Sequence, residues 1–250
     1  MDDDRDLRLL VHGASGRMGK ALLRLGAEQP GIRVVAGICG GRPGQRVVDG
    51  IPQFAASEVA GAPAFDVAID FSRPAGFDRI LSLCVERRAA LVSGTTGLED
   101  AQFTRLDDAC RQIPCAWAAN FSLGVAVLSR LVEQAAGMFA GWDCDIVEAH
   151  HSGKVDAPSG TALALGEVAT AAGATPRYAS LRAGDIVGEH LVQFTGTGER
   201  IELVHRATDR DVFARGALHA ARRLHGRAPG RYGVRDLLDG TRRAPPGPES

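Results

Sequence analysis

The chain has 250 residues, and 45% of them are hydrophobic, which is enough for one large or two modest domains with buried cores. Its formal net charge is −1 and its pI is about 6.7. The hydrophobic content excludes a wholly disordered chain. The near-neutral charge excludes the strongly basic surface of a typical nucleic-acid binder and favours small-molecule partners.

The N-terminal residues and the cysteines indicate the compartment. The stretch MDDDRDLRLLVHG is acidic and has only a short apolar run, unlike a signal peptide or a membrane span. The cysteines are odd in number and show neither C-x-x-C pairs nor zinc-type spacing. We therefore expect a cytoplasmic protein with no membrane partner, no metal and reduced structural thiols. The thiols are those of Cys39, Cys84, Cys110, Cys115 and Cys144.

Residues 7–117 alternate short apolar runs with helical patterns. This repeated order of strand and helix predicts a parallel sheet that is covered on both faces. The expected strands are 7–12, 32–38, 66–71, 90–94 and 115–119, and the expected helices are 17–29, 75–88 and 99–112.

The pattern changes near Asn120, where Ser122 is placed to cap a long helix. Further on, polar and apolar residues alternate about the turn TGTGE, which predicts an antiparallel hairpin with one face toward water. The expected order is helix 122–139, strand 144–150, hairpin strands 190–196 and 199–207, helix 211–224 and a turn at 228–233.

The two patterns predict an α/β chain of two domains. A Rossmann-like, parallel-sheet nucleotide domain is expected over 1–119 with 225–240. An α+β domain with a mixed or antiparallel sheet is expected over 120–224. The polar, Pro-rich residues 241–250 are expected to form a disordered tail.

A glycine pattern, G-x-x-G-x-x-G, follows the first expected strand at Gly13, Gly16 and Gly19. Glycines at such a turn let backbone amides approach a pyrophosphate, and the helix N-terminus adds partial positive charge. The same glycines could form only a tight turn, but their place in an alternating α/β chain favours dinucleotide binding.

The segment expected to bind the adenosine part of the cofactor has an unusual sequence. NAD-binding domains typically carry an acid about 20 residues past the glycines to hold the ribose hydroxyls, yet residues 36–45 contain none. Arg42 lies in this loop and Arg17 lies in the glycine turn. We expect them to bind a 2′-phosphate, which favours NADPH over NADH; the alternative is that they are two solvated loop arginines.

Two further segments fit a nicotinamide site. SGTTGL follows an expected strand, so Gly94, Thr95 and Thr96 belong at the carboxyl end of the sheet, where ligands of open α/β folds bind. AANFSLG begins at Ala118, where the two domains are expected to join. Each segment alone could also be an ordinary turn or helix cap without a ligand.

The stretch EAHHSGKVDAPSGTA contains the densest group of chemically active side chains. Gly153 and Pro158 predict a loop rather than a helix, so His150 and Lys154 converge only through loop geometry. A zinc site needs at least three ligands, and no further ligands cluster nearby. Structural histidines remain an alternative, but proton transfer with anion binding fits a histidine beside a lysine best.

The second half of this stretch predicts a helix start. Asp156 or Ser159 can cap it, which leaves the amides of Gly160 and Thr161 free to receive a carboxylate. Asp156 can equally pair with Lys154. These residue types favour an acidic substrate held beside a proton donor.

Taken together, the motifs resemble those of the dihydrodipicolinate reductase family of bacterial and plant lysine biosynthesis, over about residues 7–239. The similar segments are GASGRMG, DVAIDFS, SGTTGL, AANFSLGV, EAHHSGKVDAPSGTA, GERIELVHRATDRDVFARGAL and PGRYGVRDLL. The resemblance implies NAD(P)H-dependent reduction of a cyclic dicarboxylate in the diaminopimelate pathway, and a homotetramer built largely through the sheets of the substrate-binding domain.

The resemblance also implies residue roles. His150 matches the proton donor and acceptor, Lys154 matches the proton donor, and His151 with Gly160 and Thr161 matches the groups that hold the substrate carboxylates. Many members carry an acid near Cys39 and often use NADH as well, so NADH remains possible here. The matching cofactor-binding residues are Gly13, Ala14, Ser15, Gly16, Arg17, Met18, Gly94, Thr95, Thr96, Ala118, Ala119, Asn120 and Phe121.

Other functions are less compatible with these residues. A related NAD(P)H-dependent imine or amino-acid dehydrogenase would share the paired sites but not the HHSGKVDAPSGT motif. A non-catalytic dinucleotide sensor would need no proton donors, and a metal hydrolase would need ligands that are not clustered. The pair Ser152 and Gly153 replaces bulkier polar residues expected in the family, and the sequence gives it no role.

Overall fold

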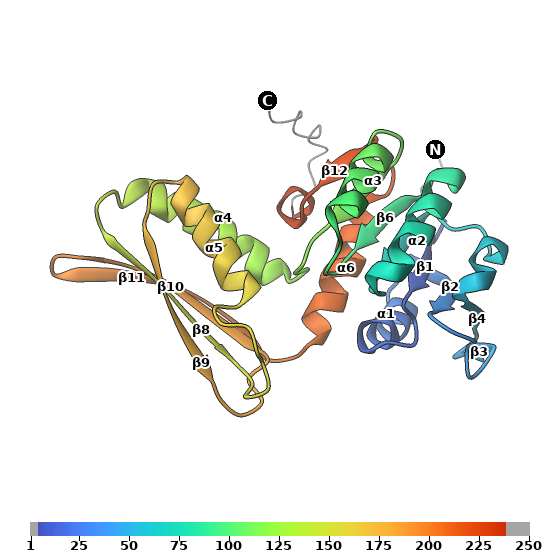
Figure 1. Ribbon diagram of the computed structural model, residues 1–250, viewed down its shortest axis with the longest axis horizontal. Coiled ribbons are helices and arrows are strands. Elements are labelled where there is room, and N and C mark those ends of the chain that lie inside the picture. Colours follow the sequence, from blue (N-terminus) through green and yellow to red (C-terminus); the bar gives the residue numbers. More distant parts are fainter. Residues whose placement is uncertain (1–4, 239–250) are drawn as a thin grey trace. The chain divides into compact units, whose positions relative to one another are not determined.

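The computed structural model describes residues 5–238, so the expected tail at 241–250 lies outside the described residues. The chain divides into two compact units (Figure 1). The first is Met1–Phe121 with Phe213–Ser250, and the second is Ser122–Val212. The α/β fold with one parallel and one mixed sheet is confirmed.

The first unit is built on an eight-stranded sheet in the order β12-β7-β6-β5-β1-β2-β4-β3. Every pairing that includes β1 is parallel, and only β3 with β4 is antiparallel. All residues of β5 and β6 are buried, because helices cover both faces. The strands are β1 (Leu7–His12), β2 (Ile32–Cys39), β3 (Val47–Val48), β4 (Ile51–Ala55), β5 (Val67–Asp70), β6 (Ala90–Ser93), β7 (Pro114–Trp117) and β12 (Gly230–Tyr232).

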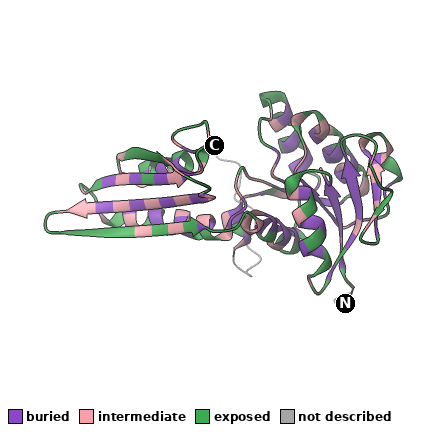
Figure 2. Cartoon of the chain, turned by 90° about the horizontal axis from the view of Figure 1, so that it is seen from below, coloured by how far each residue is buried: buried purple, intermediate pink, exposed green. Residues whose placement is uncertain are grey.

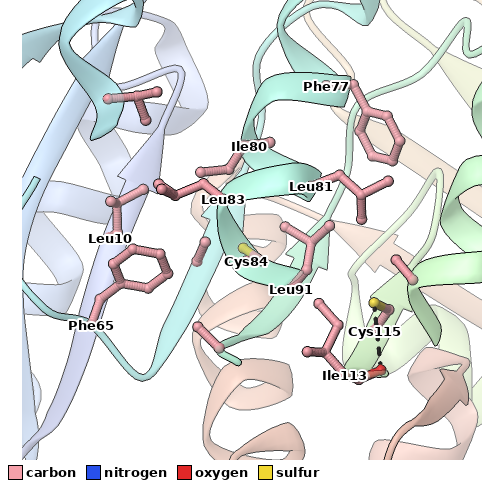
Figure 3. Close-up of a cluster of buried hydrophobic side chains, with 14 of the residues drawn as sticks. Leu10, Phe65, Phe77, Ile80, Leu81, Leu83, Cys84, Leu91, Ile113 and Cys115 are labelled. Carbon is pink, nitrogen blue, oxygen red and sulfur yellow. Dashed lines mark hydrogen bonds between the residues drawn. The ribbon is translucent and has the colours of Figure 1, made fainter. Parts of the chain in front are cut away.

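Helices connect and cover these strands. Their bounds are α1 (Arg17–Ala27), α2 (Pro74–Arg87), α3 (Asp100–Cys110) and α6 (Asp211–Leu224), with short 3₁₀ helices η1 (Ala56–Gly61) and η2 (Val234–Leu237). A cluster of buried side chains from the sheet, η1 and the helices forms the core, among them Leu10, Phe77, Ile80 and Leu91 (Figure 3). All five cysteines are free and buried, as expected of structural thiols.

The second unit contains a four-stranded mixed sheet, β11-β10-β8-β9, in which only β8 and β9 are parallel. Buried and less buried residues alternate along β8 and β10 (Figure 2). The buried face packs on two helices through residues such as Ile146, Val132 and Leu165. The elements are α4 (Leu123–Met138), β8 (Asp143–His150), α5 (Gly160–Ala171), β9 (Pro176–Arg182), β10 (Gly188–Gly196) and β11 (Glu199–Ala207).

Two expectations differ from the structure. Residues 228–233 were expected to form a turn, but Gly230–Tyr232 pair in parallel with β7 as β12. Three residues are too few for a periodic signal, so only the neighbouring strand makes them a strand. The strands β3, β4 and β9 were not predicted from the sequence.

The unit boundary also differs. Residues 213–224 were expected in the second domain, whereas nearly all of α6 belongs to the first unit. Small buried residues let α6 approach the backbone closely, and a Cβ on Gly216 would collide with the carbonyl oxygen of Phe121. The amphipathic pattern of 211–224 predicts the helix but not the surface on which it packs.

Candidate active site

The glycine loop lies between β1 and α1 and forms a tight cradle. Gly13 has φ of +83°, and a Cβ there would collide with the carbonyl oxygen of Phe71. The amides of Gly13 and Ala14 both donate to the Ile38 oxygen at 2.9 Å, which holds the loop at the end of β2. The loop geometry therefore fits the close approach of a pyrophosphate to backbone amides.

A cavity of about 730 Å³ opens beside this loop. Gly13, Ser15 and Gly16 line one part of it. The remaining lining residues are His12, Gly40, Gly41, Ala56, Phe71, Ser72, Arg73, Ala75, Gly76 and Arg79. The expected phosphate ligands Arg17 and Arg42 are exposed and are not among the residues that line this cavity.

A buried polar network lies at the carboxyl ends of β1, β5 and β6. Asp70 is fully buried and its carboxylate accepts hydrogen bonds from His12 Nδ1 at 2.7 Å and from the Ser93 and Thr95 hydroxyls at 2.8 Å. Burial raises the pKa of Asp70, but the hydrogen bond and charge of His12 and those from Ser72 and Thr95 outweigh it, so the pKa is lowered. The network holds the Asp70 carboxylate ionised next to His12, which lines the cavity.

Sequence reasoning missed His12 and Asp70. Their signal was a polar residue directly after an apolar run at the end of each strand, 58 residues apart. Thr95 was expected to contact the nicotinamide, but its side chain is only 2% exposed and its hydroxyl is hydrogen-bonded to Asp70. The Thr95 side chain therefore fixes the turn, whereas Thr96 is exposed.

The two segments expected near the nicotinamide are adjacent in the structure. Ser93 pairs with Trp117, and the Ala118 amide donates to the Ser93 oxygen at 3.1 Å. Phe121, which is buried, packs edge to face with Phe71. Neighbouring parallel strands thus bring residues 94–96 and 118–121 to the same edge of the sheet.

The second unit places His150 at the end of β8, where its Nδ1 lies 2.5 Å from Glu148 Oε2. Burial raises the pKa of Glu148, but hydrogen bonds from Arg182, Ser180 and His150 outweigh it and lower the pKa to about 2. Arg182 donates through both terminal nitrogens, at 2.9 and 2.7 Å. Because Glu148 is ionised, His150 Nδ1 carries the proton and Nε2 is the atom that can exchange one.

His150 is a buried residue whose Nε2 faces Gly188. A Cβ on Gly188 would lie 3.1 Å from Nε2, so a larger residue at 188 would crowd the imidazole. Burial lowers the pKa of His150, and the hydrogen bond and charge of Glu148 oppose that effect. The imidazole can therefore change protonation state while its ring is held in place.

Residues 151–159 form a loop, as expected, between β8 and α5. Lys154 Nζ lies 2.8 Å from Asp156 Oδ1, which confirms that these two residues pair. The Ser152 amide and hydroxyl both donate to the Gly184 oxygen, at 3.1 and 3.4 Å, so Ser152 ties the loop to the turn after β9. This contact gives Ser152 a structural account that the sequence did not provide.

Ser159 is the residue that caps α5, because its hydroxyl accepts from the Ala162 amide at 3.2 Å. The same hydroxyl lies 3.2 Å from Nε2 of His190, which sequence reasoning missed. Burial is the main cause that lowers the pKa of His190 to about 4, and His150 adds to it, so His190 is neutral near pH 7. Gly160 and Thr161 lie in the first turn, where backbone amides favour an anion.

The described part of the chain limits the other possibilities. Over residues 5–238, no group of three His, Cys, Asp or Glu side chains is arranged to hold a metal ion. Over the same residues, no helix combines the length and the apolar character needed to cross a membrane.

Known proteins resemble most of the chain. Residues 7–121 match the family model "Dihydrodipicolinate reductase, N-terminus", and residues 124–238 match "Dihydrodipicolinate reductase, C-terminus". The chain is 71% identical over 233 residues to the 4-hydroxy-tetrahydrodipicolinate reductase of Stenotrophomonas maltophilia (strain R551-3), covering 93% of this chain and 98% of the relative. It is 64% identical over 235 residues to that of Xylella fastidiosa (strain 9a5c), covering 94% and 99%.

Solved structures share the fold. Dipicolinate-bound dihydrodipicolinate reductase from Paenisporosarcina sp. TG-14 superposes with a TM-score of 0.80 at 22% identity, covering 91% of this chain and 97% of that one. The C. glutamicum DAP dehydrogenase in complex with DAP has a TM-score of 0.60 at 13% identity, covering 94% and 96%. At these identities the likeness concerns the fold alone.

Proposed function

The chain belongs to the dihydrodipicolinate reductase family, and we propose that His150 and Lys154 manage the protons in its reduction of 4-hydroxy-tetrahydrodipicolinate. It is an NAD(P)H-dependent oxidoreductase of diaminopimelate and lysine biosynthesis, and it uses a nicotinamide dinucleotide. The observation that carries the proposal is the Glu148–His150 pair beside the loop that holds Lys154.

Binding of the cyclic dicarboxylate follows from the groups at the start of α5. The amides of Gly160 and Thr161 would donate to one carboxylate at the helix N-terminus, where the Gly160 amide now donates to the Asp156 carboxylate. His151 and Lys154, both partly buried in the preceding loop, supply side-chain donors for the remaining carboxylate oxygens. This arrangement supports recognition of a substrate with two negative charges.

Proton transfer is the task of His150 Nε2 and Lys154 Nζ. Bound nicotinamide supplies a hydride, and its addition to an unsaturated ring leaves an electron pair that must receive a proton. Glu148 fixes the His150 ring and stabilises its protonated form, and Asp156 holds the Lys154 ammonium group at 2.8 Å. Both donors are thereby positioned before substrate binds, which lowers the entropic cost of the step.

The first unit would hold the cofactor. The loop of residues 13–18 fits the pyrophosphate, although the amides of Gly13, Ala14 and Gly16 already donate to backbone oxygens. Residues 94–96 and 118–121 lie at the carboxyl end of the same sheet, where nicotinamide sites of this fold occur. Residues 36–45 carry no acid, which supports a preference for NADPH while leaving NADH usable.

The uncovered face of the second sheet supports assembly into a homotetramer. The register places Ala179, Val147, Leu191 and Val204 in one row across all four strands, on the face opposite α4 and α5. Val147 and Val204 are 38% and 41% exposed, and Leu181 on the same face is 55% exposed. An apolar row of this kind is typical of a surface that another copy covers.

A cytoplasmic location is supported by the cysteines, because all five are free and buried, as is usual in a reducing compartment.

A coupled assay tests the reductase activity. Aspartate semialdehyde, pyruvate and the synthase that joins them generate the substrate, and NADPH oxidation is followed by its absorbance after this protein is added. We expect oxidation that depends on the synthase and on both of its substrates. No oxidation in the complete mixture, with the synthase shown to be active, contradicts the proposed function.

A further inference from the structure

The cavity beside the glycine loop has a wall that no expected cofactor residue explains. Gly40 and Gly41, which follow β2, line it together with Ala56, the first residue of η1. Arg73, the residue that precedes α2, and Arg79 in the second turn of α2 also line it. The end of the second strand of a dinucleotide-binding sheet is where the adenosine ribose lies, so this wall belongs to the adenosine half of the site.

The charge of the wall favours an anion. The lining residues include two guanidinium groups and no carboxylate. Nearby carboxylates are neutralised elsewhere: Asp78 pairs with Arg105 at 2.8 Å, and Glu58 pairs with Arg46 at 2.6 Å. A dianionic phosphate would therefore meet positive charge here without an opposing acid.

Arg79 is held in place but is not saturated. Its Nη1 donates to the Ala56 oxygen at 2.8 Å, which fixes the guanidinium against the start of η1. A guanidinium has five N–H donors, and this is the one hydrogen bond that the described residues provide for it. The remaining donors are available to phosphate oxygens, with part of the side-chain entropy already lost on folding.

Arg42, the candidate from sequence, is placed differently. It is exposed outside the lining of the cavity, and after Arg46 and the Ala55 amide it contributes to the low pKa of Glu58, which is about 2. Its charge is thus partly directed to a carboxylate.

We propose that Arg79, assisted by Arg73, binds the 2′-phosphate of the adenosine ribose and so determines the preference of this enzyme for NADPH. The proposal rests on the cofactor use stated above and adds a residue that determines specificity. It requires that the loss of the Arg79 charge weakens only ligands that carry the 2′-phosphate.

Binding titrations with two adenosine ligands test this directly. 2′,5′-ADP carries the 2′-phosphate and 5′-AMP lacks it, and calorimetry of each on the full chain needs no turnover. Arg79→Gln removes the charge and keeps a hydrogen-bonding side chain. Arg87→Gln is the matched control, because Arg87 lies on the same helix and donates to the Ala60 and Ala62 oxygens without lining the cavity.

We expect Arg79→Gln to weaken 2′,5′-ADP by about tenfold, the lower end for a hydrogen bond to a charged group at an exposed site, and to leave 5′-AMP unchanged. The ratio of kcat/KM for NADPH to that for NADH should fall by a similar factor. Arg87→Gln should change neither the affinity for the two ligands nor this kcat/KM ratio.

Three results overturn the proposal: equal weakening of both ligands, no weakening of either, or loss of discrimination in Arg42→Gln but not in Arg79→Gln. The wild-type coupled assay separates this outcome from a failure of the reductase function itself, because it does not depend on which arginine binds the phosphate.

Discussion

Replacing Glu148 by glutamine removes one charge from the proton-transfer site while keeping its shape. In the wild type the buried Glu148 carboxylate accepts from His150 Nδ1 at 2.5 Å and is bound by both terminal nitrogens of Arg182. Hydrogen bonds to charged groups contribute about 1.5–3 kcal/mol. If that stabilisation supports the protonated imidazole in the transition state, kcat should fall by roughly 10- to 150-fold.

The pH dependence of kcat should also shift in a defined direction. His150 donates a proton only when it is protonated. The part of kcat that depends on this donation is therefore present at low pH and is lost as pH rises through the pKa of His150. Glu148 raises that pKa against the effect of burial. Glu148→Gln removes the opposing effect, so the basic limb of kcat that belongs to His150 should move to lower pH.

Steady-state kcat between pH 5 and 9, measured with the coupled assay, checks this expectation. Thermal unfolding of the variant ensures that activity is measured on folded protein, since Arg182 loses its charged partner. Glu167→Gln, an exposed acid on α5, is the control and should behave as wild type. An unchanged kcat and an unmoved basic limb in Glu148→Gln would refute the positioning role.

Three other changes test separate parts of the enzyme. Lys154→Ala or His150→Ala should lower kcat by about 10²- to 10⁴-fold and leave the NADPH dissociation constant, measured by fluorescence, nearly intact; wild-type kcat in both would remove them from catalysis. Gly13→Ala should weaken NADPH binding about 5- to 30-fold, because alanine disfavours the left-handed backbone of the loop by about 1–2 kcal/mol; unchanged affinity would contradict the cradle. Val147→Lys should reduce the mass found by light scattering, and a wild-type monomer would contradict the tetramer.

The sequence determined the elements whose signals are local. The bounds of β1, β11 and α6 match the expected ranges residue for residue, because apolar periodicity and turn residues lie within each segment. The glycine motif and the cap at Ser159 could also be predicted, since the residues that define each pattern are at most six positions apart. The family motif then predicted which loop carries the chemistry.

The tertiary structure decided what depends on strand register and on long-range packing. The pairs His12–Asp70 and Glu148–Arg182 join residues 58 and 34 positions apart. Arg79 lines the cavity only because α2 packs beside η1, a contact that no local pattern encodes. Burial then sets the charge of these groups, because a carboxylate with low exposure stays ionised only where folding brings it enough donors.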